Sequence, residues 1–144
     1  MLLRFPRSCL VVVSLLLAGV ATAADLPSRR DALAAIAVLE NRFLSAEAVQ
    51  AAQIVTQFVE LSDDVLVYLD SEAIPWVSEG DSTDPNDPET MLRSLLLAAY
   101  FAGNAKAQLT SGKVEDMPYP GWLFVIRAYR AIQEKTDFNL PSIE

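Results

Sequence analysis

The sequence contains no histidine and only one cysteine, Cys9. Without histidine there is no Ser-His or Cys-His nucleophile pair, no imidazole metal ligand and no imidazole acid/base group. The five glycines form no phosphate-cradling loop, and the hydrolase motifs G-x-S-x-G and S-x-x-K are absent. The remaining catalytic option is a carboxyl pair across a cleft, and no acid in the sequence is marked as buried. We therefore expect no enzymatic activity and no cofactor.

Residues 1–24 have the pattern of a secretory signal peptide. Two arginines precede an apolar run that ends near residue 20, and small residues of the Ala-x-Ala type follow it at 21–24. The run is shorter than the ~20 residues that cross a bilayer, so we expect no stable membrane anchor. Cys9 is removed with the signal, which leaves a mature domain at 25–144 without disulfides. We expect export to the periplasm, with secretion as the alternative.

The spacing of apolar residues predicts an all-α fold, a single irregular bundle of about four helices. The predicted helices cover about 29–44, 46–62, 88–110 and 120–135. The helix at 88–110 is apolar on nearly every side, so we expect it at the centre of the domain. An acidic loop is expected at about 78–87. A C-terminal tail at 137–144 is expected to dock on the core through its apolar residues.

The segment 64–77 has two interpretations. Its residues 65–69 are rich in strand formers, yet they also continue the apolar stripe of the preceding helix. No partner strand is visible, and a lone strand is unstable. We expect either a helix end or a short extended segment packed on the core, followed by a buried turn at 74–77.

Basic residues are missing from the middle of the chain. No Lys or Arg occurs between Phe43 and Leu92, whereas this stretch holds eleven acids: Glu47, Glu60, Asp63, Asp64, Asp70, Glu72, Glu79, Asp81, Asp84, Asp87 and Glu89. Loss of the signal, with its two arginines and no acid, changes the net charge from −8 to −10. This charge repels nucleic acid and attracts basic proteins, so we expect a basic protein partner. The alternative is that the acids only keep the domain soluble.

Part of this acidic block has the composition of a cation-binding loop. Its weak candidate ligands are Asp81, Asp84, Asp87 and Glu89, because Ca²⁺ binds several oxygen ligands from a short loop. Their order is not that of an EF-hand. Asp87 also precedes Pro88 at the start of a predicted helix, where an aspartate caps the helix. We therefore expect no metal centre.

The aromatic residues supply the candidate contacts with a partner. Trp122, Ile126 and Tyr129 have the spacing of a core-facing helix side. Phe124 shares another side with two alanines, which either receives the helix at 88–110 closely or presents a shallow groove. Trp76 stands just before the acidic loop. The candidate partner-binding residues are Asp63, Asp64, Trp76 and Phe124.

These features favour an exported, non-catalytic helical protein that binds another protein through an acidic surface. An inhibitor or immunity-type protein against a basic enzyme is one form of this hypothesis. The alternative is a small-ligand or cation carrier that uses the 81–89 loop or a pocket between the helices at 88–110 and 120–135. No feature of the sequence fixes an oligomeric state.

Overall fold

The computed structural model describes residues 25–80 and 82–144, and within these residues the chain is all-helical. The elements are α2 (Arg29–Asn41), α3 (Ala46–Leu61), the 3₁₀ helix η2 (Pro75–Ser78), α4 (Pro88–Ser111) and α5 (Pro118–Gln133). The predicted all-α fold in one compact domain is thereby confirmed. The predicted signal peptide and Asp81 lie outside the described residues. No helix in the described part of the chain is long and apolar enough to cross a membrane.

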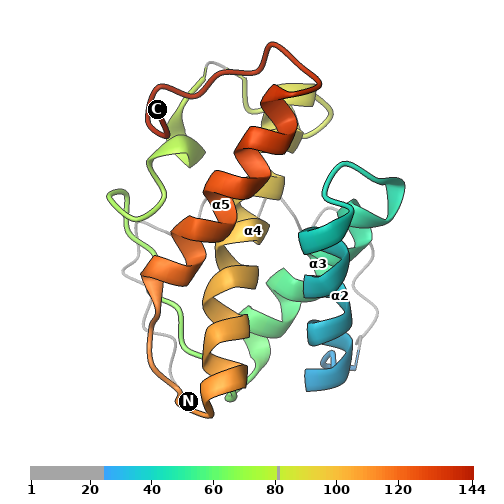
Figure 1. The fold of residues 1–144 in the computed structure, drawn as a ribbon, viewed down its shortest axis with the longest axis vertical. Coiled ribbons are helices and arrows are strands. Elements are labelled where there is room, and N and C mark those ends of the chain that lie inside the picture. The colour runs from blue at the N-terminus through green and yellow to red at the C-terminus, as the bar shows by residue number, and fades with distance from the viewer. Residues whose placement is uncertain (1–24, 81) are drawn as a thin grey trace.

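Helix α4 is the central element of the domain. It contacts α2, α3, α5 and η2, while α2 and α3 pair on one side of it and α5 lies along the other (Figure 1). Every residue of α4 from Leu95 to Ala105 is buried. The predicted central position of this helix is therefore confirmed.

Local capping residues determine where the helices begin and end. Ser28 and Asp31 form a capping box at the start of α2, with the Asp31 carboxylate accepting from the Ser28 N–H at 3.0 Å. Asp87 caps α4, where its carboxylate accepts from the Thr90 N–H at 2.9 Å, and Pro88 occupies the first turn. Gly112 ends α4 with a left-handed φ of 72°, which glycine adopts at little cost. The predicted cap at Asp87 and stop at Gly112 are confirmed.

Two glycines allow α4 and α5 to approach closely. A Cβ atom on Gly103 of α4 would collide with the Pro120 carbonyl oxygen and would lie 2.9 Å from the Phe124 Cβ. A Cβ on Gly121 of α5 would lie 2.8 Å from the Tyr100 ring. Larger residues at either position would force the helices apart, so this pair sets their separation.

The segment between α3 and η2 is extended and lies along α4. Val65 and Val67 are buried, and the Leu66 backbone pairs with the side-chain amide of Gln108 in both directions, at 2.9 and 2.7 Å. Trp76 in η2 is fully buried. Of the two interpretations of 64–77, the extended one with a buried turn is therefore correct.

The C-terminal tail packs against α5, as predicted. Phe138 and Leu140 are buried, and the Leu140 N–H donates to the Tyr129 hydroxyl at 2.8 Å. The Ser142 N–H donates to the Glu79 carboxylate at 3.0 Å, which ties the tail to the residue that follows η2. The tail therefore covers the end of the bundle that holds η2 (Figure 1).

Candidate functional site

Two of the predicted partner-binding residues are buried in the core. Trp76 is 0% exposed, and its ring meets Trp122 and Tyr100 edge-on, with centroids 5.1 and 6.5 Å apart. Phe124 is 6% exposed, and its Cβ lies against Gly103, which has no side chain to exclude it. Residues far along the chain cover both side chains, which leaves little of either for a protein partner to contact.

The aromatic residues that are exposed are different ones. Tyr119, at the start of α5, is 73% exposed, and Tyr68, in the extended segment, is 62% exposed. Trp122 and Ile126 are half-buried, so their predicted place in the core is only partly correct, whereas Tyr129 is buried as predicted. The alternation of inward and outward side chains in an extended segment would have indicated that Tyr68 is exposed, because Val65 and Val67 point inward and their neighbours point outward.

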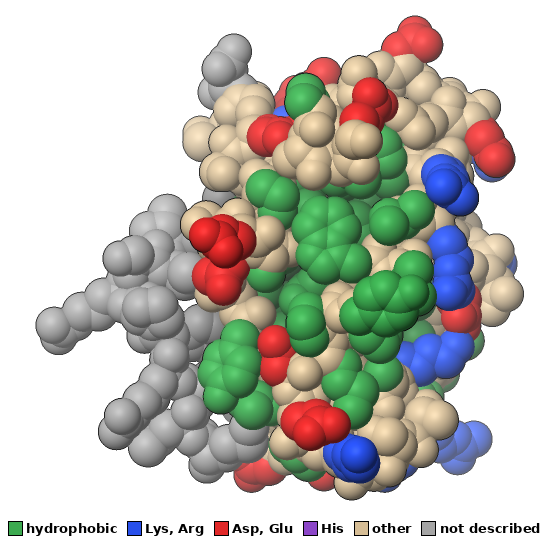
Figure 2. Space-filling view, turned by 60° about the vertical axis from the view of Figure 1, so that its left-hand side comes forward, with side chains coloured by type: hydrophobic (Ala, Val, Ile, Leu, Met, Phe, Trp, Pro, Cys, Tyr) green, Lys and Arg blue, Asp and Glu red, His purple; other side chains and the backbone are tan. Residues whose placement is uncertain are grey.

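These exposed aromatics lie on one face of the molecule. The Tyr68 N–H donates to the Asp116 carboxylate at 3.3 Å, and Asp116 lies three residues before Tyr119 in the chain. Trp122 follows Tyr119 by nearly one helical turn and rests on Trp76. Figure 2 shows hydrophobic side chains gathered over the segment 65–80 and α5. We call Tyr68, Tyr119 and Trp122, with the partly buried Leu69, Val77 and Ile126 beside them, the aromatic face.

Acidic side chains border the aromatic face. Asp70 and Glu72 are exposed and follow Tyr68 in the chain. The Asp70 carboxylate accepts from the backbone N–H groups of Glu72 and Ala73, at 2.9 and 2.7 Å, and thereby fixes the turn that carries both acids. In Figure 2, acidic side chains lie to the left of the hydrophobic area, and basic ones line its right edge. The face is therefore apolar at its centre and acidic along one border.

The acids of the predicted acidic surface are spread over a long distance. Leu66 is paired with Gln108 near the end of α4, whereas Asp87 caps its start, and the rise of a helix puts these points about 30 Å apart. Asp63 and Asp64, in the turn after α3, are exposed at the first of these ends. The acidic block thus runs along the whole length of α4, and only part of it borders the aromatic face.

The weak metal candidates that the structure describes have other roles. Asp87 caps α4, and its hydrogen bond from the Thr90 N–H lowers the pKa of its carboxyl. The Asp84 carboxylate accepts from the Asn86 N–H at 2.9 Å, and the Glu89 carboxylate lies 3.7 Å from the Arg93 guanidinium. Asp81 lies outside the described residues. Within residues 25–80 and 82–144, no group of three or more Asp, Glu or Cys is placed to hold a metal ion.

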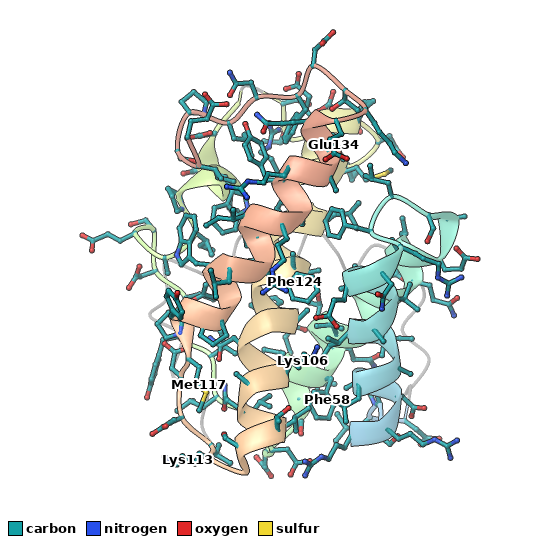
Figure 3. All side chains as sticks on the ribbon, in the orientation of Figure 1. Phe58, Lys106, Lys113, Met117, Phe124 and Glu134 are labelled. Carbon is teal, nitrogen blue, oxygen red and sulfur yellow. The ribbon has the colours of Figure 1, made fainter. Side chains whose placement is uncertain are left out.

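A groove between α2, α4 and α5 forms a second candidate site. It has a volume of about 380 Å³, and Gly103, Ala107 and Phe124 contribute to its lining. A smaller hollow of about 60 Å³, which shares Phe124 and is also lined by Ala128 and Ala131, adjoins it. Figure 3 shows Phe124 between α5 and α2, and Lys106 between α4 and α2. The sequence left two alternatives for this side of α5, close packing on α4 or a shallow groove, and both are present. Phe124 packs closely on α4, and the two alanines line a shallow hollow.

Tyr100 lies in the core beneath the aromatic face. Its ring is fully buried, and its hydroxyl has no hydrogen-bond partner among the described residues. Burial, reinforced by the negative charge of Asp116, raises the pKa of Tyr100 to about 12. The hydroxyl therefore stays protonated at physiological pH, and the residue supports the face by packing.

Comparisons of the chain with protein families, curated proteins and solved structures found no match. The fold and the two sites define its class as a small all-α domain with an exposed aromatic face and a separate groove.

Proposed function

We propose that this chain is an exported, non-catalytic helical protein that binds a basic protein through the aromatic face. One observation carries the proposal: two exposed tyrosines, Tyr68 and Tyr119, and the half-buried Trp122 lie together beside acidic residues. Tyr and Trp are the residues that most often anchor protein interfaces, and a contiguous exposed apolar area marks an interaction surface.

Buried contacts and hydrogen bonds hold the scaffold beneath the aromatic face. Trp122 rests on Trp76, and the Leu66–Gln108 pair fixes the extended segment that carries Tyr68. Anchors held in place before binding lose little conformational entropy when the complex forms. Asp70 and Glu72 add negative charge at the border of the face, which speeds the approach of a basic partner at low salt. An inhibitor or immunity-type role against a basic enzyme fits this combination.

Affinity isolation of the exported protein at low and high salt tests the proposal. We expect the parent protein to retain a basic protein at low salt and to release it at high salt. The variant Tyr68→Ala/Tyr119→Ala is expected to lose this partner. Val49→Ala, on the exposed side of α3, is the matched control and is expected to retain it. Equal retention by the double tyrosine variant would show that the aromatic face is not the binding surface.

The acidic border is tested separately by association kinetics with the isolated partner. Glu72→Gln removes a charge beside the aromatic face, whereas Asp64→Asn removes one at the turn after α3. We expect the Glu72 variant to associate more slowly at low salt and the Asp64 variant to differ less, because electrostatic steering weakens with distance. Identical rates for all three proteins at every salt concentration would remove the steering role of the border.

A further inference from the structure

The groove between α2, α4 and α5 is a site distinct from the aromatic face. On α5, residues 119, 122 and 126 share one side of the helix, whereas the groove is lined by residues 120, 123, 124 and 127. At 100° per residue these two sets face different directions. An occupant of the groove therefore leaves the aromatic face uncovered.

The floor of the groove is apolar, and its wall is charged. The apolar lining residues are Gly103, Ala107, Pro120, Leu123 and Phe124. Glu40 from α2, Lys106 from α4 and Arg127 from α5 supply the charged side chains. Its volume of about 380 Å³ lies at the lower end of the range for small-molecule sites. An apolar floor with a few polar groups at one side is the usual construction of such a site.

The charges in the groove do not balance. The Lys106 ammonium donates to both oxygens of Glu40, at 2.7 and 2.8 Å, and so satisfies that carboxylate. The Arg127 guanidinium lies 4.0 Å from Glu40, beyond hydrogen-bond distance, and it makes no hydrogen bond within the described residues. Two cations and one anion leave a local charge of +1 in a strongly acidic protein.

We propose that this groove binds a small amphipathic monocarboxylate, such as a medium-chain fatty acid. The planar guanidinium of Arg127 matches a carboxylate with two parallel hydrogen bonds. The apolar part of the ligand lies on Ala107, Leu123 and Phe124, which removes its surface from water. A ligand with a cationic head is repelled by Arg127 and Lys106.

Calorimetric titration of the full protein with octanoate, 1-octanol and octylammonium tests this proposal. We expect octanoate to bind and the other two compounds to bind at least about tenfold more weakly, since they cannot accept the paired hydrogen bonds of Arg127. Equal binding of octanoate and octanol would overturn the assignment of a carboxylate. Absence of octanoate binding at millimolar concentration would overturn the site itself.

Variants on α4 and α5 locate the binding. Arg127→Gln is expected to weaken octanoate binding about tenfold, whereas Arg130→Gln, one turn along α5 and outside the groove lining, is expected to leave it unchanged. Ala107→Leu fills the floor and is expected to abolish binding, with circular dichroism checking that the helices remain. Equal losses in the two arginine variants would indicate a general charge effect and contradict the site. Because the groove and the aromatic face are separate, we also expect Arg127→Gln to retain the protein partner.

Discussion

Gln108 and Leu66 exchange two hydrogen bonds, so that the side-chain amide of a helix residue takes the place of a neighbouring strand. The Leu66 N–H donates to the amide oxygen at 2.9 Å, and the amide nitrogen donates to the Leu66 carbonyl at 2.7 Å. The same nitrogen donates to Asn104, whose own amide binds Asp116 and the Met117 N–H. This largely part-buried network joins both loops beside α4 to the central helix.

Replacement of Gln108 by Leu tests this network. The substitution introduces an apolar side chain of similar size but leaves the Leu66 N–H and carbonyl without partners at a partly buried site. Unpaired buried groups cost about 1–3 kcal/mol each, so we expect a loss of about 2–4 kcal/mol in unfolding free energy, measured with urea. Gln53→Leu, on the exposed side of α3, is the control. A change below about 1 kcal/mol in Gln108→Leu would contradict the role given to the network.

The close approach of α4 and α5 makes Gly103 sensitive to the smallest substitution. Gly103→Ala would normally favour a helix, but here the added methyl group meets the Pro120 carbonyl. We expect a net destabilisation of about 1–3 kcal/mol by thermal or urea unfolding. Thr110→Ala, at an exposed position of the same helix, serves as the reference. Stabilisation by Gly103→Ala would show that the helices can separate at no cost.

The cap at Asp87 predicts an acid-sensitive contribution to stability. The Thr90 N–H lowers the pKa of Asp87 below its ordinary value of 3.8, so the folded protein favours the charged form. The stabilisation is present above that ordinary value and is lost as the pH falls through the lowered pKa. We expect Asp87→Ala to melt at a lower temperature than the parent at pH 7. This difference should shrink in acid, whereas a pH-independent difference would argue against a charged cap.

Glu60 on α3 should behave in the opposite way. Burial raises the pKa of its carboxyl, so folding favours the protonated form. The penalty is absent below the ordinary pKa and grows as the pH rises through the raised one. Glu60→Gln is therefore expected to stabilise the protein at pH 7, by less than about 1 kcal/mol because the group is only partly shielded from solvent. Denaturant titrations at pH 3.5 and 7 compare the two proteins, and destabilisation at pH 7 would refute this.

The sequence predicts those parts of the fold that short-range chemistry determines. Asp87 before Pro88 and Gly112 after α4 mark helix ends through interactions within a few residues. The burial of Trp76 cannot be predicted from its neighbours in the chain, because it depends on Tyr100 and Trp122, which lie far along the sequence. The extent of the acidic run in space is also set by distant contacts, because the extended segment carries the run from one end of α4 to the other.

The candidate sites were only partly predictable for the same reason. A pocket between the helices at 88–110 and 120–135 was among the alternatives, and α4 and α5 do line the groove. Its third wall, with Glu40, comes from α2, and no local pattern in the sequence links this residue to Lys106. Periodicity placed Trp122 in the core, but this residue lies at the edge of the helix contact.

The edge-on pair of Trp76 and Trp122 gives the protein its own optical reporter. These are the only two tryptophans in the chain, one fully buried and the other partly open to solvent. A quencher dissolved in water should therefore reduce the fluorescence of Trp122 and leave that of Trp76 unquenched. A protein seated on the aromatic face should shield Trp122, whereas octanoate in the groove should leave its quenching unchanged. Fluorescence of the unlabelled protein can thus tell which of the two sites is occupied.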